Sequence, residues 1–187
     1  PMEKIKHLNF QEKFIATSYE NFLVDIQFKS KRFKTQFLRV QKSGKLEKIF
    51  SKINLLINNK ILETKLYLSI LITNDKEISE INNKYRNKPY PTNIISFPTN
   101  EFQMLMTNNK KTKNHEIYFG DIVISMEKII IEAFDEKKKV QDHFLHLIVH
   151  GILHLIGFEH CTERKAKKME EVEKNILNFV DIKNPYL

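Results

Sequence analysis

The sequence predicts a globular fold that contains both helices and strands and is built around one buried helix. The chain has 187 residues, of which 41% are hydrophobic and 11% aromatic, and this is enough apolar material to form the core of one domain. Short segments with strand-like alternation separate longer segments with helical periodicity. Residues 144–158 are apolar on every side apart from their histidines, and a helix without a polar face belongs in the middle of a domain.

Residues 1–19 show no clear pattern, and we expect them to form an N-terminal extension of unknown role before a single domain at residues 20–187. Strands are expected at residues 21–28, 65–73, 92–97 and 118–124. Helices are expected at residues 31–59, with an interruption near Ser43 and Gly44, and at residues 74–85, 125–138, 142–157 and 162–180. The last four helices each have a capping residue that can accept a hydrogen bond from the first turn, namely Asn74, Ser125, Asp142 and Thr162.

The composition favours a polyanionic partner and a reducing compartment. The formal net charge is +8 and the isoelectric point about 9.4; a basic surface attracts RNA, DNA or anionic membrane, although a solvated lysine-rich surface has the same composition. Cys161 is the only cysteine, so no intramolecular disulfide forms. The first residues lack an apolar signal-peptide core, and residues 144–158 are shorter than the ~20 residues that span a bilayer. We therefore expect a cytoplasmic protein without a membrane partner.

The most informative motif is a set of three histidines with the spacing H-x3-H-x5-H: His150, His154 and His160. Four residues is about one helical turn, so the first two imidazoles lie on one face and can bind the same ion. Gly157 can adopt the left-handed conformation that ends a helix, after which the chain returns His160. Three protein ligands leave the fourth position of a tetrahedral Zn²⁺ open for water, as in catalytic sites.

Gly151 follows the first of these histidines, where metalloproteases with the HExxH motif have their glutamate base. A glycine inside a helix costs about 0.5–1 kcal/mol relative to alanine. This cost predicts that substrate or neighbouring backbone approaches closely at this position. A lone histidine in so apolar a helix would be a core residue, but three at this spacing, closed by a glycine, favour a metal site.

Three segments occur in a fixed order: YRNKPYPTNIISFP at residues 85–98, GDIVIS at 120–125 and HGILHLIGFEH within 150–160. Together they resemble the YbeY family of bacterial endoribonucleases and rRNA maturation factors, over about residues 21–180. The resemblance implies an α+β, zincin-like fold, in which a small mixed β-sheet packs against helices and a central buried helix binds the metal. One departure is Glu159, where the family usually has Asp.

For function, the resemblance implies metal-dependent cleavage of single-stranded RNA, maturation of the 3′ end of small-subunit rRNA, and ribosome quality control. It implies one Zn²⁺ per chain, bound by His150, His154 and His160. The expected partners are single-stranded RNA or rRNA and the small ribosomal subunit or its assembly factors. Arg86, in the R-x5-TN segment, matches the family's arginine. Its planar guanidinium suits a bidentate phosphate contact. We expect it to be a catalytic residue that stabilises the charge developing on the phosphoryl oxygens, in a loop that rims the metal site.

Zn²⁺ lowers the pKa of bound water from 15.7 to about 7, but the general base is not determined by the sequence. His146 lies one turn before His150 on the same face, where it could relay protons, orient a ligand, or be a buried structural residue. Glu159 is the other candidate, either as the base or as a group that orients His160. His143 is expected to be an ordinary surface residue.

Further residues are candidates for substrate binding. Thr92, Asn93 and Ser96 either line a groove or serve strand and turn geometry, and Lys110, Lys111 and Lys113 are expected to contact the RNA backbone near the metal. Two other functions stay open at this point. One is a zincin-type metallopeptidase, against which Gly151 and the basic charge argue. The other is a non-catalytic RNA- or ribosome-binding module with a structural metal, for which Cys161 would be a fourth ligand.

Overall fold

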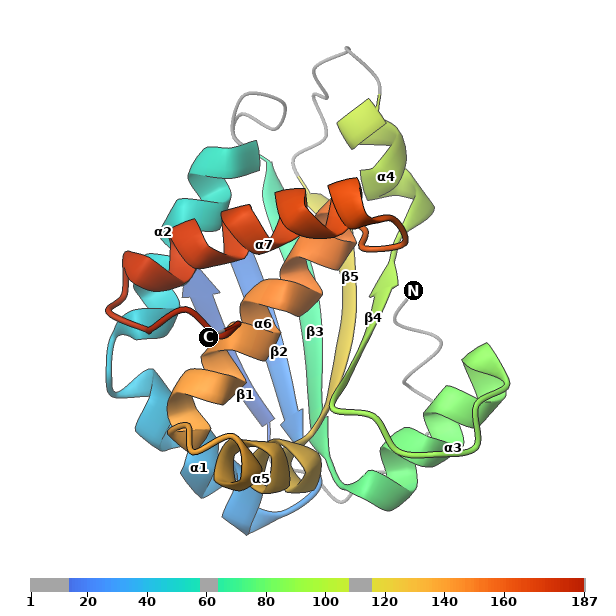
Figure 1. The fold of residues 1–187 in the computed structure, drawn as a ribbon. Coiled ribbons are helices and arrows are strands. Elements are labelled where there is room, and N and C mark those ends of the chain that lie inside the picture. The colour runs from blue at the N-terminus through green and yellow to red at the C-terminus, as the bar shows by residue number, and fades with distance from the viewer. Residues whose placement is uncertain (1–13, 58–63, 108–115, 187) are drawn as a thin grey trace.

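The computed structural model of the chain describes residues 14–57, 64–107 and 116–186. A five-stranded mixed sheet, in the order β1-β2-β3-β5-β4, lies behind a layer of helices (Figure 1). The strands are β1 (Phe14–Tyr19), β2 (Phe22–Phe28), β3 (Lys65–Thr73), β4 (Ile94–Pro98) and β5 (Glu116–Ser125). The helices are α1 (Lys31–Gln41), α2 (Lys45–Ile57), α3 (Asp75–Arg86), α4 (Asn100–Thr107), α5 (Met126–Asp135), α6 (Val140–Ile156) and α7 (Glu163–Asn178).

The sheet is parallel in its centre and antiparallel at both edges. β2 pairs with β3 and β3 with β5 in parallel, whereas β1 and β4 pair antiparallel with their neighbours. Both faces of the centre are covered: the main core contacts α1, α2 and α6, and a smaller cluster that includes Leu71 and Val123 packs against Ile78 and Ile81 of α3. A strand that is buried on both faces of a sheet needs apolar side chains on both faces. The sequences of β3 and β5 are therefore nearly continuous hydrophobic runs.

α6 is the central helix, and most of its residues are buried against β4, α5, α7 and the sheet. Gly151 allows the close packing with β4, since a Cβ atom there would lie 2.7 Å from Ile94 Cδ1 and 3.1 Å from Ser96 Oγ. The Ser96 hydroxyl donates to the Gly151 carbonyl at 3.1 Å. A close approach at Gly151 is therefore confirmed, but the nearest atoms belong to side chains of β4 and not to the substrate or neighbouring backbone that the sequence predicted. The mixed sheet, its helices and the buried central helix confirm the predicted α+β class.

Several boundaries differ from those the sequence predicted. Residues 14–19, assigned to the extension, form the edge strand β1, whose alternating exposure leaves little apolar signal. α4 was not predicted; its first turn is held by Thr99 Oγ1, which accepts from Phe102 N at 3.3 Å. α6 begins at Val140 without a side-chain cap, and Asp142 pairs with Lys45 at 3.5 Å instead. Within the described ranges no helix is long and apolar enough to cross a membrane.

Candidate metal centre

The three histidines of the motif converge where α6 ends. His150 and His154 project from one face of α6, and Gly157 ends the helix in the left-handed conformation with φ of 105°. The Gly157 N–H satisfies two carbonyls of the last helical turn, since it donates to Leu153 O at 3.1 Å and to His154 O at 3.0 Å. The chain then turns and brings His160 back. One ligand atom from each histidine lies within 4.8 Å of the others, so the predicted grouping is confirmed.

Hydrogen bonds at Nδ1 determine which nitrogen of each α6 histidine is free. His150 Nδ1 lies 2.7 Å from Glu173 Oε1, and His154 Nδ1 lies 3.0 Å from the carbonyl of Phe158. Since a carboxylate and a carbonyl only accept, both Nδ1 atoms carry the proton and donate. The Nε2 atoms of the two rings face each other and lie 3.0 Å apart. Two nitrogens at this distance can share one cation, either a proton or a metal ion.

This donor set fits Zn²⁺. Zinc–nitrogen bonds of 2.0–2.1 Å in a tetrahedron place two nitrogens about 3.3 Å apart, so the observed 3.0 Å between the Nε2 atoms needs an adjustment of only a few tenths of an ångström. Burial, reinforced by the nearby charge of His150, lowers the pKa of His154 to about 4. His154 is therefore neutral at physiological pH, which is the form that binds a metal.

Glu173, a residue not predicted from the sequence, positions His150. Its side chain has no solvent exposure; one oxygen accepts from His150 Nδ1, and the other accepts from the Tyr186 hydroxyl. Burial alone would raise the pKa of Glu173, but interactions with His146 and His150 hold it below its ordinary value. A carboxylate that accepts from a metal-binding histidine fixes the ring and raises its basicity.

His146 also lies near this carboxylate. Its Nε2 is 3.9 Å from Glu173 Oε2, beyond hydrogen-bond distance, and among the described residues neither ring nitrogen has a hydrogen-bond partner. Its ring packs edge-on against Tyr186, with centroids 5.8 Å apart. The expectation that His143 lies on the surface is wrong: it is buried, and its Nε2 lies 2.9 Å from Glu132, because α5 covers this end of α6.

Glu159 lies in the turn before His160 and is exposed. Its Oε2 is 2.5 Å from Lys165 Nζ, and this ammonium group lowers the pKa of the Glu159 carboxyl. The Cys161 thiol donates to the same oxygen at 3.6 Å. Cys161 lies outside the described metal-binding group. Glu159 is therefore an ionised partner of Lys165. Among the described residues, Glu159 makes no hydrogen bond to His160 that would orient this ring.

Of the other predicted residues, Ser96 lies beside the histidine motif, since its hydroxyl donates at 3.1 Å to the carbonyl of Gly151, the residue after His150. Arg86 is exposed and is the last residue of α3, not part of the next loop. α3 packs against β5 and α5, apart from the junction of α6 and α7 (Figure 1). Asn93 donates to Glu132, and the same carboxylate contacts His143, which lies two turns before His150. Thr92, the residue before Asn93, is half-buried. Three predicted RNA contacts lie outside the described residues: Lys110, Lys111 and Lys113.

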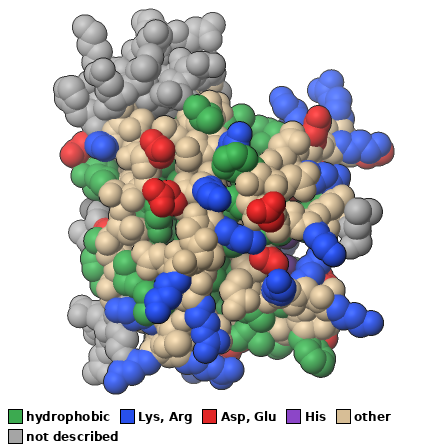
Figure 2. Space-filling view, turned by 90° about the vertical axis from the view of Figure 1, so that its left-hand side faces the viewer, with side chains coloured by type: hydrophobic (Ala, Val, Ile, Leu, Met, Phe, Trp, Pro, Cys, Tyr) green, Lys and Arg blue, Asp and Glu red, His purple; other side chains and the backbone are tan. Residues whose placement is uncertain are grey.

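The basic side chains are not gathered in one patch on the face formed by α1 and α2. Figure 2 shows Lys and Arg side chains over much of this face, with acidic side chains interspersed. The net charge of +8 therefore does not by itself mark the position of a binding site.

Comparisons with known proteins agree with the motif. The sequence model described as endoribonuclease YbeY matches residues 27–181. Endoribonuclease YbeY of Bartonella bacilliformis is 47% identical over 119 residues, which cover 64% of this chain and 71% of that protein. The corresponding proteins of Bartonella henselae and a Chelativorans species are 42% and 40% identical over 119 residues, which again cover 64% of this chain and 71% and 69% of those proteins.

Among solved structures, the solution structure of TM1509 from Thermotoga maritima aligns with a TM-score of 0.48 and 24% identity, over 74% of this chain and 82% of that one. The family match covers most of the chain, including all three histidines of the metal centre. The chain belongs to the endoribonuclease YbeY family.

Proposed function

We propose that this protein is a zinc-dependent endoribonuclease that cleaves single-stranded RNA. The observation that carries the proposal is the convergence of three histidines, two of which direct their Nε2 atoms at a common point. His150, His154 and His160 would hold a zinc ion, which would supply a hydrolytic nucleophile at neutral pH and polarise a phosphoryl oxygen. Membership of a family named for RNA cleavage makes RNA the substrate to test first.

The residues of the chain have separate tasks in this proposal. Glu173 and the Phe158 carbonyl hold the His150 and His154 rings with Nε2 toward the metal. Arg86 binds a backbone phosphate of the RNA at a distance from the scissile bond, since α3 lies apart from the histidines. Arg86→Ala should then raise KM with little change in kcat; a loss of 100-fold or more in kcat would instead assign Arg86 to the reacting phosphate.

Two side chains are candidates for proton transfer. Glu159 is ion-paired with Lys165, which keeps its pKa below the neutral range in which a general base works best. His146 is partly buried beside Glu173, and its ring nitrogens have no hydrogen-bond partner among the described residues. Comparison of the pH–rate profiles of Glu159→Gln and His146→Gln separates them, because only loss of the true base removes a limb of the profile.

The cellular role that we propose is maturation of the 3′ end of small-subunit rRNA and ribosome quality control in the cytoplasm. The small ribosomal subunit or its assembly factors would be the partners. Support for this step is the resemblance of the three motifs to the YbeY family, and the basic charge of the chain is compatible with rRNA as substrate.

The two alternatives receive less support. A metallopeptidase with these ligands needs a glutamate base where this chain has Gly151, and a Cβ at that position would already lie 2.7 Å from Ile94. A structural zinc site needs a fourth protein ligand. Cys161, the nearest candidate in sequence, instead donates to Glu159.

The test uses the zinc-loaded chain with single-stranded RNA, duplex RNA of the same sequence, and casein. We expect cleavage of the single strand alone, and no cleavage by a His154→Ala variant that folds but binds no zinc. Cleavage of casein would favour the peptidase. Binding of RNA without cleavage, at full zinc occupancy, would favour the binding module.

A further inference from the structure

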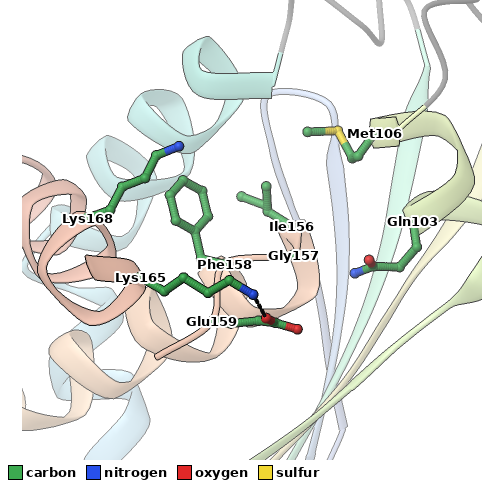
Figure 3. Close-up of a pocket in the computed structure, with 8 residues that line it drawn as sticks. All are labelled: Gln103, Met106, Ile156, Gly157, Phe158, Glu159, Lys165 and Lys168. Carbon is green, nitrogen blue, oxygen red and sulfur yellow. Dashed lines mark hydrogen bonds and ion pairs between the residues drawn. The ribbon is translucent and has the colours of Figure 1, made fainter. Parts of the chain in front are cut away.

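A cleft of about 370 Å³ opens at the turn that precedes His160. Its walls come from α4, the end of α6, the turn that follows, and the start of α7 (Figure 3). The turn belongs to both features: Phe158 and Glu159 line the cleft, the Phe158 carbonyl accepts from His154, and His160 comes next in the chain. The cleft and the metal centre therefore share this turn of the chain.

The cleft has apolar walls. The partly buried ring of Phe158 stands on the side of α7, and the thioether of Met106 stands across the opening on α4 (Figure 3). Ile156, only 7% exposed, lies between them at the end of α6. An aromatic ring and a polarizable thioether on opposite sides of the opening suit a flat, apolar-faced ligand.

The edge of the cleft carries one unbalanced positive charge. Lys165 and Glu159 neutralise each other, with Nζ 2.5 Å from Oε2. The Lys168 ammonium lies 5.9 Å from the centroid of the Phe158 ring. Across the ranges that the structure describes, no carboxylate oxygen comes within 4.0 Å of Lys168. A phosphate would find at Lys168 a cation that is not already paired.

We infer that this cleft is a subsite for one unpaired nucleotide of the RNA, with its base between Phe158 and Met106 and its phosphate beside Lys168. The inference rests on the proposed function and deepens it. Bases stack on aromatic side chains whatever their sequence, and nearby cations hold the backbone. A base in a duplex is already stacked and paired, and extracting it costs a few kcal/mol. The subsite therefore supplies a physical reason for selectivity toward single strands.

The experiment compares three variants of the zinc-loaded full chain. Phe158→Leu removes the aromatic face but keeps an apolar side chain and the backbone carbonyl. Lys168→Gln removes the unpaired charge. Lys167→Gln is the matched control, because it removes a lysine from the same helix whose partner is Glu163, outside the cleft. Zinc content and circular dichroism establish that each variant retains its metal and its fold.

Binding is followed by stopped-flow fluorescence with a short single-stranded RNA that contains 2-aminopurine, before turnover, and cleavage is followed on gels. Phe158→Leu should weaken binding by about 5- to 150-fold, the range for loss of one base–aromatic stack. Lys168→Gln should lower the slope of log K against log salt concentration by about 0.7, the value for one phosphate contact with a single strand. Lys167→Gln should match the wild type in both.

An abasic nucleotide, moved along the RNA, makes the assignment specific. One position should weaken binding to the wild type, and that penalty should vanish in Phe158→Leu, because the stacking partner is already gone. Wild-type affinity in both Phe158→Leu and Lys168→Gln, with cleavage intact, would overturn the subsite and leave the nuclease standing. Failure of the wild-type chain to bind single-stranded RNA would overturn both.

Discussion

Replacing Glu173 by Gln should lower the affinity of the chain for zinc about tenfold. The Glu173 carboxylate is fully buried and lies 2.7 Å from His150 Nδ1. A hydrogen bond to a charged group contributes about 1.5–3 kcal/mol and one between neutral groups about 0.5–1.5 kcal/mol. The glutamine amide oxygen can still accept from His150, so the loss is the difference, about 1–1.5 kcal/mol, and 1.4 kcal/mol is a factor of ten.

Glu173→Ala should have a larger effect, toward the 100-fold end of the range for lost partners of metal-binding histidines. It removes every acceptor, so His150 Nδ1–H and the Tyr186 hydroxyl both lose their partner. Without an acceptor at Nδ1, the His150 ring no longer prefers the tautomer that leaves Nε2 free for the metal.

Zinc affinity is measured by competition with a chromophoric chelator at neutral pH. Glu171→Gln is the control, since it removes the same charge from an exposed position on the same helix. Thermal unfolding of the metal-free proteins shows whether the fold is retained. In a His150→Ala background the Glu173 substitution should have no further effect, because the ligand through which it acts is gone. Equal affinities for Glu173→Gln and Glu171→Gln would show that the buried carboxylate does not position the ligand.

Three further results follow from the packing. Gly151→Ala should lower the denaturant midpoint, since overpacking costs about 1–3 kcal/mol, and Ile94→Val should restore part of it by removing the Cδ1 atom that lies 2.7 Å from the new Cβ. Thr162→Ala should cost about 1 kcal/mol in chemical unfolding, because its side chain caps α7. Burial would raise the pKa of Glu132, but the hydrogen bond from His143 helps to outweigh this and lowers it. The stability that this carboxylate contributes is present above its unfolded pKa and is lost as pH falls through the lowered value. The unfolding free energy of Glu132→Gln, measured by chemical unfolding at several pH values, should therefore fall less steeply in acid than that of the wild type.

The histidine cluster could be predicted because its geometry is local. A spacing of four residues in a helix and a glycine at its end determine where His150, His154 and His160 can lie, whatever packs around them. The position of Arg86 could not be predicted in this way, since it depends on how α3 packs on the sheet. The order of residues along the motif does not specify how far α3 lies from the histidines.

Glu173 was missed although the sequence contains a signal for it. Met169, Glu173 and Ile176 recur at helical spacing and all three are buried, so the carboxylate lies on the apolar face of α7. A lone acidic residue on such a face needs a buried partner. The identity of that partner depends on the docking of α7 on α6, a contact between helices that no local pattern specifies. α4 was missed for a related reason, because its core contact, Phe102 against Phe119, forms only in the folded sheet.

The position of α7 links metal binding to the proposed RNA subsite. The start of this helix carries Lys165 and Lys168 on the wall of the cleft, and its middle places Glu173 against His150. Both lysines are exposed whereas Glu173 is buried, so one helix serves the cleft with exposed residues and the metal centre with a buried one. The buried side therefore determines where the exposed side stands relative to the metal. In the proposed complex, α7 would therefore set the distance between a nucleotide in the cleft and the histidines, and a fixed distance is what positioning a phosphodiester for cleavage requires.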